Sequence, residues 1–249
     1  MIEKIFNNVK KPLIYEVFSD IILSGSRSYP NFKEDFSMKI IKPSYEILTP
    51  ISKGGVAELK RIETAARTCY KSEDKITKDG TSARKMVKAL ITRGHEAMLE
   101  HSQLSVKFIC DRGVTHEMVR HRICSFAQES TRYCNYSGDK FGNELTFIEP
   151  FFFKDNPAYY NAWKDACKKC EDTYMYLIAH GVTPQEARSV LPNSLKTEIV
   201  VTANYREWRS IFKLRCAKDA HPQIREVMIP LQKELAEKLP EVFDIPDLY

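Results

Sequence analysis

The order in which helix and strand patterns follow one another constrains this fold more than any other feature of the sequence. Residues 103–110 alternate apolar and polar side chains, which predicts a half-buried strand. Residues 197–202 are rich in β-branched side chains and predict a second strand, and residues 144–148 predict a shorter one. The helical patterns around them do not alternate regularly with strands, as they would in a parallel α/β sheet. The sequence therefore predicts a single domain of the α+β class.

Helices are expected where apolar side chains recur every three or four residues. The long segments with this pattern are residues 56–69, 82–92, 113–123, 158–180 and 222–239. Gly94 and Gly181 can each end the preceding helix in the left-handed conformation. Two more helices have clear start signals: Thr183 is followed by a proline and a glutamate in a capping box, and Asn204 opens a similar start.

The chain is expected to divide at Met38. Residues 1–37 end in a stretch rich in glycine, serine and proline, and we expect an N-terminal extension that is poorly ordered. Residues 38–249 are enough for one sizeable domain. No run approaches the roughly eighteen apolar residues of a membrane span, and residues 1–11 lack the apolar core of a signal peptide. We therefore expect a cytoplasmic protein that does not bind membranes.

Charge and cysteine content narrow the class of partner. The formal net charge of +5 suits an anionic small molecule and is too weak to indicate nucleic-acid binding by itself. The seven cysteines are scattered and odd in number, in a chain large enough to fold without covalent staples. We expect them to be reduced thiols.

Residues 120–133 carry the strongest chemical signal. They begin with Arg120-His121-Arg122 and continue through a segment of hydroxyl and amide side chains to Arg132-Tyr133. Hydroxyls, backbone N–H groups and a guanidinium suit a phosphate monoester. If the preceding helix continues through this triplet, its two arginines point in roughly opposite directions. They would then serve two ligands, or one of them would face another subunit.

The spacing of this segment resembles the signature of the flavin-dependent thymidylate synthase family (ThyX), in which Arg-His-Arg is followed after seven residues by serine, here Ser130. The resemblance covers roughly residues 38–239. It also includes Ala65-Ala66-Arg67, Gly94-His95-Glu96, Glu100-His101, Glu186-Ala187-Arg188, Leu191-Pro192, Asn204-Tyr205-Arg206 and Leu214-Arg215.

Members of this family make dTMP from dUMP with 5,10-methylenetetrahydrofolate, FAD and NADPH, and form homotetramers with shared active sites. The resemblance implies a reductive methyltransferase of that fold, a domain whose central antiparallel or mixed sheet is flanked by helices. It implies dUMP, folate and further copies of the chain as partners, without nucleic acid or membrane.

The resemblance also assigns roles to single residues. Arg215 is implied to be catalytic, because it would bind the uracil and favour its ionised, nucleophilic form. The implied dUMP-binding residues are Glu117, Arg120, Gln128, Ser130, Thr131, Arg132, Arg188 and Arg215. The implied cofactor-binding residues are His95, Arg120, His121, Arg122, Gln128, Asn204, Arg206 and Ser210.

The residues themselves are compatible with these roles. A cation against the uracil carbonyls stabilises developing negative charge, and a flavin supplies hydride chemistry that side chains cannot. The chain has only nine glycines and neither a G-x-G-x-x-G nor a Walker motif, so FAD is not held by a Rossmann loop.

Three positions depart from the family pattern. Ala97 replaces a frequent threonine, Glu117 replaces a frequent glutamine, and Ser210 stands where some members have asparagine or histidine. The family histidine near Asp219 and His221 cannot be placed with certainty.

Other readings of the reactive residues are weaker. His95 and His101 are six residues apart and do not share a helix face, so we expect no metal site. Cys167 and Cys170 form a single C-x-x-C in the middle of a predicted helix, which favours ordinary helix cysteines over a redox pair. Cys124 is a candidate thiol nucleophile at uracil, yet no evident group other than Arg122 would stabilise its thiolate.

Two other functions remain as alternatives. The same arginines, with Tyr133 and Tyr136 as stacking platforms, would also suit an RNA- or nucleotide-binding module without catalysis. A structural scaffold with a decayed motif is the third alternative, and the intact set of arginines disfavours it.

Overall fold

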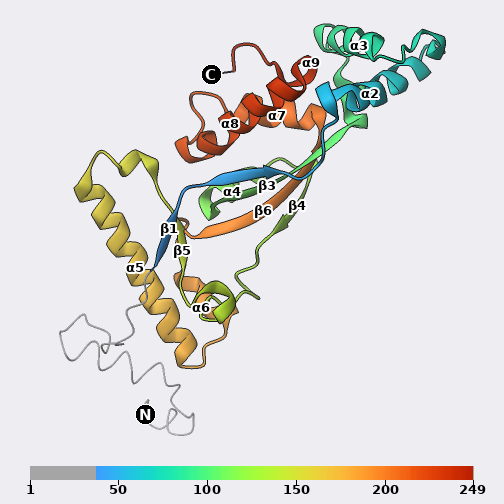
Figure 1. The fold of residues 1–249 in the computed structure, drawn as a ribbon. Helices are drawn as coiled ribbons and strands as arrows, with labels where there is room; N and C mark the ends of the chain where they lie inside the picture. The colour runs from blue at the N-terminus through green and yellow to red at the C-terminus, as the bar shows by residue number, and fades with distance from the viewer. Residues whose placement is uncertain (1–37, 249) are drawn as a thin grey trace, which may run out of the picture. The chain divides into compact units, whose positions relative to one another are not determined.

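The computed structural model describes residues 38–248, so the expected N-terminal extension lies outside the described residues. Its main sheet has four antiparallel strands in the order β2-β3-β6-β4 (Figure 1). Their bounds are Ser44–Ile47 (β2), Gln103–Asp111 (β3), Lys196–Asn204 (β6) and Cys124–Gln128 (β4). A separate pair of parallel strands joins β1 (Lys39–Ile41) to β5 (Thr146–Ile148). These strands and the helices around them confirm the predicted α+β class.

The central strands β3 and β6 pair along their full length, from Gln103 opposite Asn204 to Asp111 opposite Lys196. Alternate side chains of both strands are buried, and those between them are partly exposed. The predicted strand at 103–110 is confirmed, with its apolar face turned to the core. This amphipathic alternation fixes the register, because a slip of one residue would turn the buried set to solvent.

Helices surround the sheet in the following order. Their bounds are Val56–Thr68 (α2), Thr81–Thr92 (α3), Arg112–Met118 (α4), Pro157–Ala179 (α5), Pro184–Ala187 (α6), Tyr205–Arg215 (α7), Pro222–Lys238 (α8) and Pro240–Phe243 (α9). Five of them match predicted helices closely; α9 was not predicted. The αL backbone expected at Gly94 is present, with φ of 72°.

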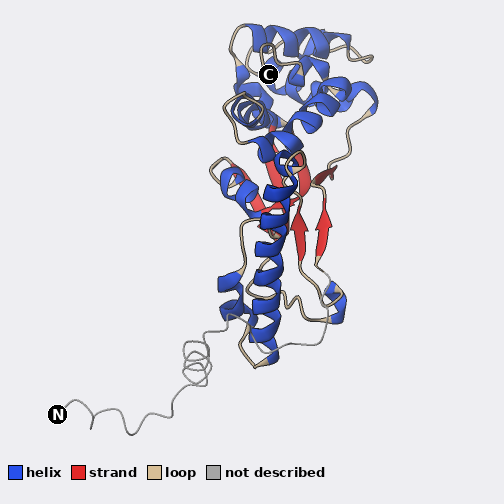
Figure 2. Ribbon diagram, turned by 90° about the vertical axis from the view of Figure 1, so that its left-hand side faces the viewer, coloured by secondary structure: helices blue, strands red, loops and turns tan. Residues whose placement is uncertain are grey.

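The longest helix, α5, lies beside the β1–β5 pair (Figures 1 and 2). The side chain of Asn156 caps its first turn by accepting from the Tyr159 N–H. The buried carboxylate of Glu171 accepts from the Leu145 N–H at 2.8 Å and so ties α5 to the start of β5. No helix within residues 38–248 is long and apolar enough to cross a membrane.

The segment after α4 differs from the prediction. The helix expected over residues 113–123 ends at Met118, and the chain turns so that Cys124 can begin β4 opposite Ala203. Arg120 and Arg122 therefore lie in this turn rather than on a helix, and the argument from helical directions was wrong. Residues 124–128, expected to be loop, form an edge strand because backbone pairing with β6 outweighs their polar composition.

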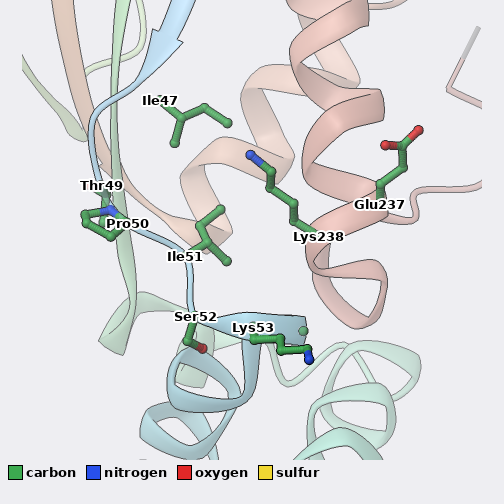
Figure 3. Close-up of a pocket in the computed structure, with 9 residues that line it drawn as sticks. Ile47, Thr49, Pro50, Ile51, Ser52, Lys53, Glu237 and Lys238 are labelled. Carbon is green, nitrogen blue, oxygen red and sulfur yellow. The ribbon is translucent and has the colours of Figure 1, made fainter.

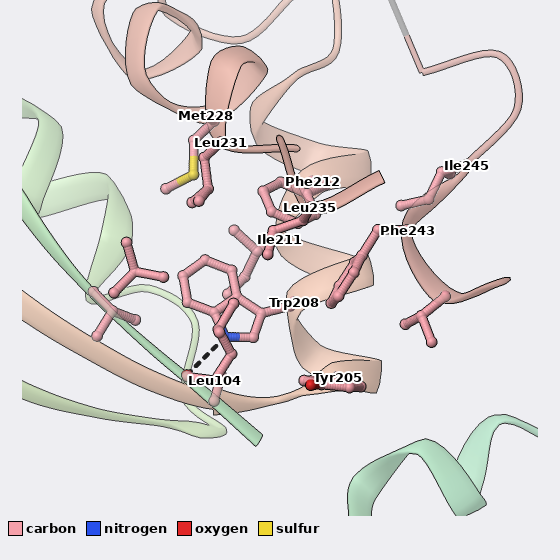
Figure 4. Close-up of a cluster of buried hydrophobic side chains, with 14 of the residues drawn as sticks. Leu104, Tyr205, Trp208, Ile211, Phe212, Met228, Leu231, Leu235, Phe243 and Ile245 are labelled. Carbon is pink, nitrogen blue, oxygen red and sulfur yellow. Dashed lines mark hydrogen bonds between the residues drawn. The ribbon is translucent and has the colours of Figure 1, made fainter. Parts of the chain in front are cut away.

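The main core lies between the sheet and α7, α8 and α9 (Figure 4). Trp208 at its centre is fully buried, and its indole N–H donates to the Leu104 carbonyl of β3 at 3.0 Å. Phe212 stacks on Trp208 and meets Phe243 edge to face. Gly55, with φ of 68°, lets the chain enter α2 against Leu239, where a Cβ atom would collide. These contacts fix α7, and with it the residues that α7 carries.

We expect Trp208→Ala to destabilise the protein by roughly 3–5 kcal/mol, because it removes a fully buried indole and leaves a cavity. Urea unfolding should show a lower midpoint at an unchanged slope. Tyr70→Ala, at a side chain that is 79% exposed, is the control and should change stability by less than about 0.5 kcal/mol. Equal effects of the two variants would contradict the assigned core.

Candidate active site

The structure gathers the predicted site residues into three groups. The first lines a pocket at the start of α7, the second surrounds Arg215 at its end, and the third forms a loop of residues 130–132 after β4. The first two groups are linked by Glu207, which lines the pocket and whose carboxylate lies 3.4 Å from Nδ1 of His121.

The pocket at the start of α7 has a volume of about 420 Å³. Asn204 ends β6 and caps α7, since its side-chain oxygen accepts from the Glu207 N–H at 2.8 Å. This leaves the amide N–H₂ of Asn204 as a donor. Along α7, positions 207, 210 and 213 are three residues apart and share one face. The pocket is lined by Glu96, Glu100, Ile123, Asn204, Arg206, Glu207, Ser210 and Lys213.

The donors and acceptors of this pocket suit a group that carries both phosphates and hydroxyls. Arg206, Lys213 and Ser210 can donate to phosphate oxygens, and the three carboxylates can accept from hydroxyls. In the chain alone, Arg206 pairs with Glu100 at 2.6 Å, with both side chains about half exposed. An exposed pair of this kind contributes little stability, so an anion can displace Glu100 at small cost.

Arg215 is held by three contacts. Its Nε donates to Nε2 of His121 at 2.9 Å, one terminal nitrogen donates to the Glu117 carboxylate at 2.9 Å, and the other donates to the Glu117 carbonyl at 3.0 Å. A guanidinium has five N–H groups, so two remain for a ligand. The contacts fix the plane of the guanidinium while its side chain stays 20% exposed.

The contact with Arg215 defines the protonation of His121. Because a guanidinium can only donate, Nε2 of His121 must accept, and the neutral ring then carries its proton on Nδ1, facing Glu207. Burial lowers the pKa of His121 to about 4, and the charge of Arg215 lowers it further. The imidazole is therefore neutral at pH 7 and acts here as a support for Arg215.

The loop of residues 130–132 presents hydroxyls and guanidinium groups. The Ser130 hydroxyl accepts from the Arg132 N–H at 3.3 Å, and the buried Thr131 hydroxyl lies 3.5 Å from Nη1 of Arg188 on the segment after α6. Nε of Arg132 donates to the Gln185 amide oxygen at 3.1 Å. Within residues 38–248 neither Arg132 nor Arg188 forms an ion pair, so this corner of the molecule holds uncompensated positive charge.

Comparison with known proteins agrees with this geometry. Residues 56–241 match the family model described as thymidylate synthase complementing protein. Proteins called flavin-dependent thymidylate synthase are similar in sequence: that of Pyrococcus abyssi is 33% identical over 72% of this chain and 75% of its own length. The protein of Geobacter sulfurreducens is 31% identical over 73% of this chain and 79% of its own. That of Pyrococcus furiosus is 38% identical, over 58% of this chain and 59% of its own length.

The chain belongs to the flavin-dependent thymidylate synthase family. The resemblance seen in the sequence is thereby confirmed, and the alternatives of an RNA-binding module and a decayed scaffold fall behind it.

Other predicted residues of this flavin-dependent synthase lie apart from one another. The side-chain amide of Gln128 donates to the hydroxyls of Thr115 and Thr197, at 3.0 and 3.3 Å, so it points across the sheet in this chain. His95 is exposed beside Glu96, which pairs with the buried Arg209 at 3.3 Å. Arg120 and Arg122 are exposed in the turn before β4.

The cysteines of this family member are thiols in the structure. Burial raises the pKa of Cys124 to about 12, and the charge of Glu207 adds to the effect, so Cys124 has no thiolate to offer at neutral pH. Burial also raises the pKa values of Cys167 and Cys170. All seven cysteines are free, as expected.

A second hollow lies away from the predicted site (Figure 3). It has a volume of about 440 Å³ between the chain that follows β2 and the end of α8, and Ile47, Pro50, Ile51 and Lys238 line it. None of the predicted site residues borders it, and its larger volume does not make it the better candidate.

Several site residues of this synthase were missed from the sequence, namely Glu96, Glu100, Ile123, Glu207 and Lys213. The spacing of three between residues 207, 210 and 213 was a usable signal, since it puts them on the face of α7 that carries Ser210. Glu96, Glu100 and Ile123 come from distant segments, and only the folded chain brings them to α7.

Stability should depend on pH through His121. Its native pKa of about 4 is below the ordinary 6.5, so between these values the unfolded chain binds a proton that the native chain does not. The free energy of unfolding should therefore be highest above pH 6.5 and fall as pH decreases towards 4. His121→Asn should weaken this fall in urea unfolding at pH 4.5–7.5, and His116→Asn, at an exposed imidazole, should keep it. Parallel profiles for wild type and His121→Asn would refute the assignment.

Proposed function

We propose that this protein makes thymidylate by reductive methylation of dUMP to dTMP, with 5,10-methylenetetrahydrofolate as the carbon donor, FAD as the cofactor and NADPH as the reductant. The observation that carries the proposal is the family match over residues 56–241 combined with a guanidinium, that of Arg215, held rigidly with two donors to spare. The reaction needs no membrane, and with free thiols we place it in the cytoplasm.

FAD is proposed to bind at the pocket of α7. Asn204, Arg206 and Ser210 line that pocket, and His95, His121 and Arg122 come from the flanking segments. When bound, FAD supplies the hydride that completes the methyl group, a step outside side-chain chemistry. The chain orients it through the helix start that Asn204 caps and through the donors of Arg206 and Ser210.

The dUMP phosphate is proposed to bind at the loop of residues 130–132, together with Arg188. Both guanidinium groups there lack a carboxylate partner within residues 38–248, and charge-assisted hydrogen bonds to phosphate are among the strongest available. Arg215 is proposed to meet the uracil carbonyls with its two remaining N–H groups. Negative charge that develops on the ring as carbon 5 becomes nucleophilic is stabilised there.

The active site is proposed to be shared between subunits of a homotetramer. Arg215 and His121 lie before the start of β4, and the phosphate loop follows its end. The five residues of this strand span roughly 16 Å, so the two groups of one chain are set far apart for a single nucleotide. Exposed apolar side chains surround the first group, namely Val119, Ile123 and Leu214, and Arg120 and Arg122 stand among them. Burial of this patch against another copy would carry Glu117, Gln128 and both arginines to a neighbour's ligand.

Arg215→Ala should abolish dTMP formation while FAD remains bound, because the variant removes the cation at the uracil and leaves the pocket of α7 intact. Arg132→Ala should instead weaken dUMP binding by roughly 1.5–3 kcal/mol, a ten- to hundredfold rise in the dUMP requirement. Tritium release from dUMP labelled at carbon 5 measures the chemistry, and flavin absorbance measures retained FAD. Near-native kinetics in both variants would refute the assigned roles.

Mixing the two variants tests the sharing of sites. Tetramers assembled from both chains contain some sites with an intact Arg215 and an intact Arg132 contributed by different subunits. Activity at low dUMP should then exceed the sum of the separate variants after co-refolding. No gain in mixtures that are shown to be mixed would assign both residues to one chain.

Cys124→Ala should keep most of the dTMP-forming activity, because a thiol with a pKa near 12 is not a nucleophile at neutral pH. The same tritium assay measures this, with flavin content as the control for folding. A variant that retains FAD and is inactive would point to a covalent thiol mechanism in place of hydride transfer alone.

A further inference from the structure

A buried network lies directly beneath the loop of residues 130–132. The Glu129 carboxylate accepts from the Tyr136 hydroxyl at 2.7 Å with one oxygen and from Nζ of Lys196 at 3.0 Å with the other. Its backbone N–H donates to the Glu198 carbonyl at 2.8 Å. Glu129 is 12% exposed, and it has no direct contact with the proposed ligand positions.

The network encloses the loop from both sides. Glu129 precedes the loop and Tyr136 follows it, so their hydrogen bond closes the segment that contains Ser130, Thr131 and Arg132. Inside it, the N–H groups of Tyr133 and Cys134 both donate to the Ser130 carbonyl, at 3.1 and 2.9 Å. The Tyr136 ring is buried against Tyr174 and Phe141. The loop is thereby anchored to the sheet at its entry and to the α5 side at its exit.

The network also removes the charge that a buried carboxylate would set against a phosphate. Burial alone would lower the pKa of Lys196, but hydrogen bonds to Glu198 and Glu129 raise it overall, so the ammonium stays charged. Lys107 in turn pairs with Glu198 at 2.5 Å. Two cations thus balance two carboxylates, and the positive charge of Arg132 and Arg188 is left uncancelled.

We propose that Tyr136, Glu129 and Lys196 are positioning residues that hold the loop of residues 130–132 in its phosphate-binding form and so set the preference for a nucleoside monophosphate over the free nucleoside. This inference rests on the proposed function, because it takes dUMP as the ligand of that loop. It assigns the three residues no contact with the reacting atoms.

Tyr136→Phe tests the inference because it removes one hydrogen bond and keeps the ring that fills the core. Calorimetric titration of the FAD-loaded protein should show about tenfold weaker dUMP binding, and the affinity for deoxyuridine should stay within twofold. In steady state, KM for dUMP should rise about tenfold at a nearly constant kcat. A merely structural loss would lower both affinities or the flavin content together.

The chain contains a matched control with the same chemistry elsewhere. The Tyr160 hydroxyl donates to the Glu149 carboxylate at 3.2 Å, and Lys154 pairs with the same carboxylate at 3.0 Å, at the start of α5. Tyr160→Phe should leave both affinities unchanged. Lys196→Met, with Lys154→Met as its control, is the second variant and should weaken dUMP binding selectively.

The outcomes separate this inference from the function on which it rests. A wild-type protein that makes dTMP, with a Tyr136→Phe variant of unchanged preference for dUMP over deoxyuridine, overturns the inference alone. A wild-type protein that binds dUMP without releasing tritium overturns the proposed reaction, and the binding titrations still decide the role of Tyr136. A tenfold effect in Tyr160→Phe would show that any Tyr–Glu pair stabilises the protein and would also overturn the inference.

Discussion

The pairing of β3 with β6 is the interaction on which the other features depend. Its nine-residue register fixes both ends of β6. At one end Lys196 supports the network beneath the loop of residues 130–132, and at the other Asn204 starts α7. The same strand provides the edge on which β4 forms. The apolar face of the pair fixes α7 through Trp208, so a single hydrophobic alternation positions all three groups of site residues.

The site residues differ in how their charges are satisfied, and the difference matches their proposed roles. Arg215 is constrained by partners that leave two donors open, whereas Arg132 and Arg188 have no carboxylate within residues 38–248. A guanidinium that must orient a ring gains from fixed geometry, and one that must attract a phosphate gains from unbalanced charge. Lys196, in contrast, is fully engaged with acidic neighbours, which suits a residue that supports the loop from beneath.

Sequence patterns were sufficient for the elements that bury a periodic face. The strand at residues 103–110 and the helices α2, α3, α5 and α8 follow directly from such periodicity. They were insufficient for β4, whose polar residues become a strand only by pairing with β6, and for the end of α4 at Met118. The roles of Arg215, His121 and the loop of residues 130–132 came from the family resemblance. The contact that fixes the His121 tautomer and the bonds of Glu129 link residues up to 94 positions apart, which no local pattern encodes.

The edge strand β4 gives the motif its length. Between Arg122 and Ser130 the chain is a strand whose residues are matched one to one with β6, from Cys124 opposite Ala203 to Gln128 opposite Ile199. Adding or removing one residue there would move Ser130 by about 3.3 Å along the sheet and would also turn every intervening side chain to the opposite face. The interval between the arginine triplet and the serine therefore works as a ruler, and its tolerance is less than one amino acid.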